Sequence, residues 1–299
     1  MVTVQKRARR LDWVLYAMIL PTIAYFVVFR VIPVYNMRLA FYDFKAKSAW
    51  VFAGLKYFKQ IFATPAFYDI LRNTLVISLM KYVLLFPFFV VFAIALFELK
   101  SSALRRYVQV VSYLPHFLSW VVIAGIWISF LSPSTGAIND ILAFFGGLRV
   151  DFMTDKSKIR WILMISEGWR SLGWDSIIYC TTILAIPQSL FESAEIDGAR
   201  RGAIIRHIIL PALVAPMVTM FILNLGFFLN AGFDQVFNFT NDSVNSVIDI
   251  LDTYVYRLGL GNGQYSLSTA VGLVKGVVGV ALVALTHMVS KRLTGKGVW

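Results

Sequence analysis

The sequence contains one cysteine, Cys180, and three histidines that lie far apart, His116, His207 and His287. A single cysteine excludes a disulfide bond and a cysteine-based zinc site within the chain. The histidines match no metal-ligand spacing, and we interpret them as structural residues. The patterns Gly-x-x-x-x-Gly-Lys-Ser/Thr, His-Glu-x-x-His and Gly-x-Ser-x-Gly are also missing from the sequence. We therefore expect no catalysis, metal or cofactor in this chain, and any ATP that drives it must bind another subunit.

Charged residues are scarce and acidic ones scarcer: 15% of the chain is charged and 59% is hydrophobic. A soluble domain cannot bury so much apolar surface, whereas lipid accepts it without cost. The net charge of +12 would suggest nucleic-acid binding in a soluble protein. Here many basic residues flank apolar runs, where they meet anionic lipid headgroups. We therefore expect membrane lipid as a partner and no nucleic acid.

Six apolar runs approach or exceed the length that a membrane-spanning helix needs. They cover residues 14–34, 74–97, 108–131, 161–186, 208–230 and 267–290, approximately. The alternating pattern of a β-barrel, an internal repeat and a separable soluble domain are all missing. The sequence therefore predicts an all-α, polytopic membrane protein with six transmembrane helices in one domain, residues 1–299.

Charge on the connecting segments predicts the orientation. With six spans both termini lie on one side, and Lys and Arg are roughly twofold denser there, which favours cytoplasmic termini. The first run follows a basic segment, residues 6–10, but no small-x-small cleavage site, so we interpret it as an uncleaved signal-anchor. Residues 35–73 mix basic and aromatic side chains and are expected to include an interfacial helix on the extracytoplasmic side.

One polar stretch separates the fourth and fifth runs. Ser189 followed by Glu192 forms a capping box, which predicts a helix that begins at Ser189. Gly198 can adopt a positive φ and end that helix after roughly two turns. Asp197 is expected to cap a second short helix. The stretch is therefore predicted to form a charged helix–turn–helix at the membrane surface.

The same stretch reads Glu-x-Ala, three residues, Gly, nine residues, Ile-x-Leu-Pro. This pattern, with an Asp-Gly-Ala core, resembles the EAA loop of ABC-importer permeases, although Ser193 stands where that family usually has Ala. The resemblance implies a coupling helix, within residues 188–207, that sits in a groove of the ATP-hydrolysing subunit. The residues that it assigns to this contact are Glu192, Ala194, Asp197, Gly198 and Ala199. An ordinary capped cytoplasmic turn is the alternative.

Further stretches resemble the LplB-like branch of sugar-importer permeases, which is associated with oligo- and polysaccharide uptake. They lie at residues 29–33, 54–58, 113–120, 172–179, 264–272 and 297–299. The resemblance implies the ABC type I importer permease fold in a bacterial cytoplasmic (inner) membrane. It also implies a heterodimer with a second homologous permease, two ATPase subunits that hold ATP and Mg, and an extracytoplasmic solute-binding protein. The pair Thr286-His287 departs from the branch, where Asn is expected.

Charged residues inside the predicted spans are functional by default, because burial in the membrane is expensive. Lys81 and Lys275 have no partner on their own helix. Glu167 and Arg170 are three residues apart and can neutralise each other. Asp175 can pair with a lysine on another helix.

Aromatic and amide side chains on the fourth and fifth runs suit a saccharide, because sugar rings stack on aromatic faces and amides bind hydroxyl groups. Helix packing and interfacial aromatic belts are the alternative interpretation. The candidate residues of the substrate path, charged residues included, are Lys81, Trp169, Arg170, Trp174, Asp175, Tyr179, Asn224 and Lys275, with Trp161 and Asn230 as further candidates.

Three intramembrane cations, Lys81, Arg170 and Lys275, favour an acidic cargo such as a fragment of a uronate polymer. Importers of uronate polymers, such as those for alginate, also resemble this branch. Internal ion pairs and neutral plant-polysaccharide fragments are the alternatives. An ATP-independent carrier or channel would need its own coupling-ion site or an inverted repeat, and the sequence shows neither. A membrane enzyme is disfavoured because nucleophiles and metal ligands are not clustered.

Overall fold

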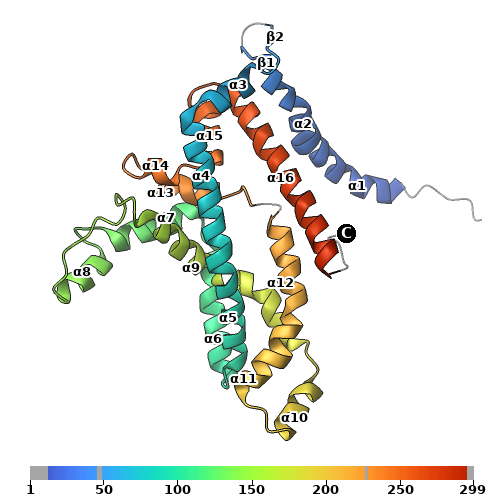
Figure 1. Cartoon of the computed structure of the whole chain (residues 1–299), viewed down its shortest axis with the longest axis vertical. Helices are drawn as coiled ribbons and strands as arrows, with labels where there is room; N and C mark the ends of the chain where they lie inside the picture. The colour runs from blue at the N-terminus through green and yellow to red at the C-terminus, as the bar shows by residue number, and fades with distance from the viewer. Residues whose placement is uncertain (1–12, 46–48, 226–227, 295–299) are drawn as a thin grey trace, which may run out of the picture.

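The computed structural model describes residues 13–45, 49–225 and 228–294 (Figure 1). The predicted basic segment before the first span and the stretch 297–299 lie outside the described residues, and so does the side chain of Thr286. The described chain is helical except for its turns and one antiparallel hairpin, β1 Tyr42–Asp43 with β2 Val51–Phe52.

Four helical segments are long and apolar enough to cross a membrane: Tyr16–Phe41, Pro65–Glu98, Arg201–Leu225 and Tyr265–Leu285. The number rises to six if each of two bent helix pairs counts as one span. The first segment lies within α1 Trp13–Phe26, η1 Val27–Val31, α2 Ile32–Asn36 and η2 Met37–Phe41. The second is formed by α4 Pro65–Met80, η3 Lys81–Leu85 and α5 Phe86–Glu98, and the third by α11 Arg201–Ile204, η5 Ile205–Ile209 and α12 Leu210–Leu225. The fourth lies within α16 Tyr265–Thr294.

Prolines interrupt three of these segments without ending them. Pro33, Pro87 and Pro211 each stand two residues after a π-helical turn, η1, η3 and η5 respectively. Proline lacks an N–H group and its ring clashes with the carbonyl group four residues earlier. A wider π turn just before the ring accommodates both defects, so the helix continues through the membrane.

The third predicted span, residues 108–131, is wrong as a single straight helix. Helix α6, Ser102–Tyr113, continues as the 3-10 turn η4, Leu114–Phe117, and meets α7, Trp120–Leu131, at a bend of 107°. Pro115 removes a backbone donor, and Leu118 and Ser119, which follow the 3-10 turn, are extended. The Ser119 hydroxyl then accepts a hydrogen bond from the Val122 N–H group at 3.4 Å and starts a new helix. The second bent pair, α9 Ile159–Leu184 and α10 Gln188–Ile196, meets at 67°.

The predicted interfacial segment, residues 35–73, is too long. Residues 35–41 continue the first helix, and α4 begins at Pro65, a residue type that suits the first helical position. Only the hairpin and helix α3, Lys56–Ala63, remain between them. Hydrogen bonds from Tyr57 and Lys56 to the Asp43 carboxylate tie α3 to β1 and lower the pKa of Asp43.

The long connection before α16 folds back into the bundle. It contains α13 Phe233–Phe239, α14 Asn245–Ile248, α15 Leu251–Tyr256 and η6 Arg257–Gly261. The buried Gln235 amide donates hydrogen bonds to the Leu163 carbonyl oxygen at 2.7 Å and to the Ser166 hydroxyl at 3.0 Å. These bonds hold α13 against α9. Helix α8, Ala137–Phe144, which follows α7 in the chain, projects to one side of the molecule (Figure 1). Helix α10 and the hairpin lie at opposite ends of the molecule (Figure 1).

Helix α9 packs closely against the end of α6 at Gly173. A Cβ atom at this position would lie 2.3 Å from Tyr113 Cδ1 and 2.5 Å from the Ser112 carbonyl oxygen. We expect Gly173→Ala to destabilise the fold by about 1–3 kcal/mol, because backbone must move to admit the methyl group. Thermal unfolding in detergent measures this effect. Gly125→Ala on α7 is the matched control, because a Cβ atom there meets nothing within 4 Å, and equal melting temperatures would contradict the prediction.

Candidate functional site

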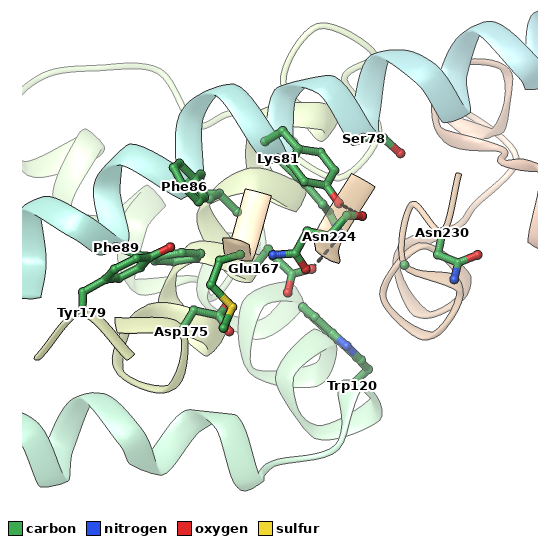
Figure 2. Close-up of a pocket in the computed structure, with 14 residues that line it drawn as sticks. Ser78, Lys81, Phe86, Phe89, Trp120, Glu167, Asp175, Tyr179, Asn224 and Asn230 are labelled. Atoms are coloured by element: carbon green, nitrogen blue, oxygen red, sulfur yellow. Dashed lines mark hydrogen bonds and ion pairs between the residues drawn. The ribbon is translucent and has the colours of Figure 1, made fainter. Parts of the chain in front are cut away.

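A central cavity of ≈ 370 Å³ lies where α4, η3 and α5 meet α9, α12, the start of α7 and the segment before α13 (Figure 2). Its wall combines aromatic rings with polar side chains. The lining residues are Ser78, Lys81, Tyr82, Leu85, Phe86, Phe89, Trp120, Glu167, Asp175, Tyr179, Met220, Asn224, Asn230 and Gly232. A cavity with an apolar wall and a few convergent polar groups is the usual form of a small-molecule site.

An ion pair stands at the centre of the wall. Lys81 Nζ lies 2.6 Å from Glu167 Oε2, and the Ser171 hydroxyl donates a hydrogen bond to Glu167 Oε1 at 3.1 Å. Both charged side chains are 17% exposed. Because the two charges compensate each other and the carboxylate also accepts a hydrogen bond from Ser171, the pair is tolerated inside an apolar bundle.

Gly232 lets the backbone lie directly against this pair. Its φ is +98°, and a Cβ atom there would lie 2.8 Å from Lys81 Nζ. The positive φ favours glycine, and a side chain there would have to displace the Lys81 amine. The segment before α13 therefore packs onto the lysine that faces it from η3.

Other polar groups of the wall have spare hydrogen-bonding capacity. The Ser78 hydroxyl is buried and has no hydrogen-bond partner among the described residues. Asn224 and Asn230 face the cavity with exposed side chains. Together with the half-buried ring of Trp120, these groups offer a stacking surface and polar contacts to a hydroxyl-rich ligand.

The segment predicted to be the coupling loop, residues 188–207, contains α10 and lies at one end of the molecule (Figure 1). We refer to it as the coupling loop. Helix α10 begins at Gln188 with Pro187 in the N-cap position and has no side-chain cap, so the predicted capping box is wrong. The fixed φ of proline starts the helix one residue before Ser189. The prediction for Gly198 is confirmed: its φ is +70° and it follows the end of α10. Asp197 does not cap α11, because Arg200 occupies the N-cap position there.

The coupling loop presents a mixed surface to solvent. Glu192, Asp197 and Gly198 are exposed, whereas Ala194 and Ala199 are half-buried against the bundle. Ile196 is 87% exposed. Leu190, on the same helix, is also exposed. An exposed charged helix with two exposed apolar side chains suits a protein partner.

Residues 90–295 match the family described as "Binding-protein-dependent transport system inner membrane component". The chain belongs to this family. It is a multi-pass inner-membrane permease subunit of an ABC importer and not itself an enzyme.

Several relatives of this permease are similar over nearly their whole length. The polygalacturonan/rhamnogalacturonan transport system permease protein YteP of Bacillus subtilis is 37% identical over 95% of this chain and 90% of its own. Protein LplB of the same organism is 36% identical over 97% of this chain and 92% of its own. The predicted LplB-like branch is therefore confirmed.

The permease also resembles a chain in the crystal structure of a bacterial ABC transporter involved in the import of the acidic polysaccharide alginate. The TM-score is 0.88 at 36% identity, covering 95% of this chain and 96% of that one. A second structure, of bacterial alginate ABC transporter in complex with alginate pentasaccharide-bound periplasmic protein, gives the same TM-score and identity over 96% of each chain. The predicted importer permease fold is confirmed.

The structure brings only part of the predicted substrate path together. Lys81, Asp175, Tyr179 and Asn224 all line the central cavity, as does Asn230. The remaining candidates lie elsewhere: Trp161, Trp169, Arg170, Trp174 and Lys275 are not among the lining residues.

Arg170, Trp169 and Trp174 join α9 to the bent α6–α7 segment instead. The Arg170 guanidinium donates a hydrogen bond to the His116 carbonyl oxygen at 3.3 Å and lies 5.0 Å from the centroid of the Trp120 ring. The Trp174 ring stacks on His116 at 4.4 Å, and Trp169 packs edge-on against Trp127 at 6.3 Å. These contacts hold the bend and orient Trp120 at the cavity.

Two of the predicted pairings are wrong. Glu167 pairs with Lys81 and not with Arg170, and no lysine forms an ion pair with Asp175 among the described residues. Lys275 pairs instead with Asp252 of α15 at 2.5 Å, away from the cavity. All three membrane cations therefore have partners within the chain. Their presence does not in itself require an acidic substrate.

Sequence reasoning missed several cavity residues, among them Ser78, Tyr82, Trp120 and Gly232. A partial signal was available for Ser78, because it lies three residues before Lys81 in one predicted helix and therefore on the same face. Trp120 and Gly232 lie far from Lys81 in the sequence, and only the folded chain brings them to it.

Proposed function

We propose that this permease subunit carries an acidic oligo- or polysaccharide of the uronate class into the cell by alternating access. The observation that carries the proposal is the likeness, over nearly the whole chain, to two permeases of uronate-polymer systems. One is the polygalacturonan/rhamnogalacturonan permease, and the other belongs to the alginate importer. Neither of these relatives supports the alternative, an ATP-independent carrier or channel.

The assembly that we propose has four further protein components: a second homologous permease, two ATPase subunits that bind ATP and Mg, and an extracytoplasmic solute-binding protein. The coupling loop, with Glu192, Ala194, Asp197, Gly198 and Ala199, docks on an ATPase subunit, which places that end of the single 1–299 domain and both termini in the cytoplasm. The exposed α10 supports this contact. The opposite end, with the β1–β2 hairpin and α3, then faces the solute-binding protein.

Saccharide passes through the central cavity in this proposal. Trp120 offers a ring face to the sugar, while Asn224 and Asn230 bind its hydroxyl groups. Lys81 is the one basic residue of the described cavity wall. The Lys81 ammonium group has three donors, so it can bind a uronate carboxylate while it remains paired with Glu167. Binding stays weak, since a ligand drives the cycle only through its different affinities for the two states.

The experiment compares acidic and neutral cargo in the complete complex reconstituted in proteoliposomes with the cognate solute-binding protein. We expect oligogalacturonate to stimulate ATPase activity and to accumulate inside. A neutral galactose oligomer of equal length is the matched control and should do neither. Stimulation by the neutral oligomer alone would overturn the acidic-cargo proposal, and uptake without ATP would overturn the importer mechanism.

A further inference from the structure

The cytoplasmic end of α5 contacts both halves of the coupling loop, although it belongs to a different span. Covalently, α10 follows α9 and α11 leads into α12. Phe97 and Glu98, the last two residues of α5, reach one helix each. We call these two residues the α5 joint.

Phe97 provides the contact with α10. Its ring lies 5.7 Å from the ring of Phe191, centroid to centroid. Arg105 of α6 fixes this end of α5 by donating hydrogen bonds to the carbonyl oxygens of Phe97 at 2.9 Å and Leu99 at 2.8 Å. A cation on the last carbonyl groups stabilises a helix C-terminus, so the Phe97 ring is presented from a fixed support.

Glu98 provides the contact with α11. Its Oε2 atom lies 3.6 Å from Nε of Arg201, the first residue of α11. Phe191 and Arg201 stand on opposite sides of the Gly198 turn. The α5 joint therefore contacts the coupling loop on both sides of the turn at Gly198.

The other end of α5 forms part of the cavity wall through Phe86 and Phe89. From Phe89 to Phe97 the helix is uninterrupted, a distance of about 12 Å at the rise of an α-helix. One apolar cluster runs beside it: Leu85, Phe89 and Tyr179 at the cavity belong to the same cluster as Phe97, Phe191, Ala194 and Ala199 at the coupling loop. Close-packed interiors transmit displacement over such distances.

We propose that α5 carries the movement of the coupling loop to the central cavity, with Phe97 and Glu98 as its positioning residues. This inference rests on the proposed ATP-driven function. Helix α5 would transmit the movement in addition to α9 and α12, the two helices that are covalently continuous with the coupling loop. When an ATPase subunit displaces α10 and α11, the α5 joint makes α5 move with both of them. The cavity wall at Phe86 and Phe89 then shifts with the same helix.

The test follows the cavity directly. Cys180 is the only cysteine of the sequence, so Cys180→Ser gives a cysteine-free background into which Ser78→Cys is introduced. Ser78 lines the cavity and is 2% exposed. In the full complex without saccharide, alkylation of this cysteine is measured with and without ATP plus vanadate. The parent should show a change in alkylation rate when the nucleotide is trapped.

Phe97→Ala should keep ATP hydrolysis but reduce this nucleotide-dependent change by about two- to tenfold, the range that corresponds to loss of an aromatic pair. Phe88→Ala is the matched control, because it removes a ring from the same helix at a position that is 50% exposed and outside both the joint and the cavity. If Phe97→Ala keeps normal ATP hydrolysis but loses the nucleotide-dependent change in alkylation, Phe97 acts as a positioning residue. A general loss of structure would lower both. Unchanged response in Phe97→Ala, or no nucleotide response in the parent, would overturn the inference.

An exchange of the two charges tests the second contact. Glu98→Arg and Arg201→Glu should each weaken the cavity response, by up to about fivefold for a partly exposed pair, and the double variant should restore it. If the double variant does not restore the response, the Glu98–Arg201 contact does not transmit the movement. Because no saccharide is present, failure of the uronate experiment with an intact nucleotide response would reject the cargo and leave the joint standing.

Discussion

Replacing Gly198 by Val is expected to abolish ATP-driven uptake in a permease that still inserts and folds. Gly198 has a φ of +70°, a conformation that costs a β-branched residue roughly 1–2 kcal/mol or more. A Cβ atom at this position would meet nothing within 4 Å, so the effect comes from the backbone and not from a clash. The turn must rearrange, and α10 then leaves the direction in which it meets the ATPase subunit.

Uptake and saccharide-stimulated ATPase activity in the reconstituted complex measure this effect. Gly202→Val is the matched control, because Gly202 lies four residues on, within α11, has no positive φ and also has open space around it. Gly198→Asn should retain much of the activity, since asparagine tolerates a left-handed conformation better than other residues. Normal uptake by Gly198→Val would reject the proposed coupling role of this turn.

The sequence predicted the helical architecture well because apolar length is a direct physical requirement of a membrane span. It did not predict the 107° bend within residues 108–131. Hydropathy over a long window does not register the lost donor at Pro115 or the new cap at Ser119. The capping box at Ser189 failed for a related reason, since Pro187 already starts the helix. In both places a proline determined where a helix begins or ends.

The candidate site was harder to predict, because its charges meet across the fold. Lys81 and Glu167 are 86 positions apart, and nothing in either local pattern reveals that η3 turns one toward the other. Spacing on one helix favoured Glu167 with Arg170, but the guanidinium lies over Trp120 instead. Cation–π stacking competes with ion pairing for arginine, and sequence spacing does not indicate which partner wins.

Removing Lys81 is expected to be the most damaging single change in the cavity. Lys81→Met leaves the Glu167 carboxylate, 17% exposed, without its counter-ion inside the bundle. Breaking a buried pair in this way costs roughly 3 kcal/mol or more, because the remaining charge has lost its compensation. We expect a lower melting temperature in detergent and loss of uptake. The double variant Lys81→Met/Glu167→Gln removes both charges, and its glutamine oxygen still accepts the bond from Ser171.

Comparison of stability with transport then separates the two roles of Lys81. If the lysine also binds the cargo, the double variant regains stability but not uptake of oligogalacturonate. The Lys275–Asp252 pair is the matched control, because its side chains are 18% and 25% exposed and neither residue lines the cavity. Lys275→Met/Asp252→Asn should restore stability and uptake together relative to Lys275→Met alone. Full uptake by Lys81→Met/Glu167→Gln would show that the cavity cation serves only the fold, since removal of both charges would then leave the cargo path intact.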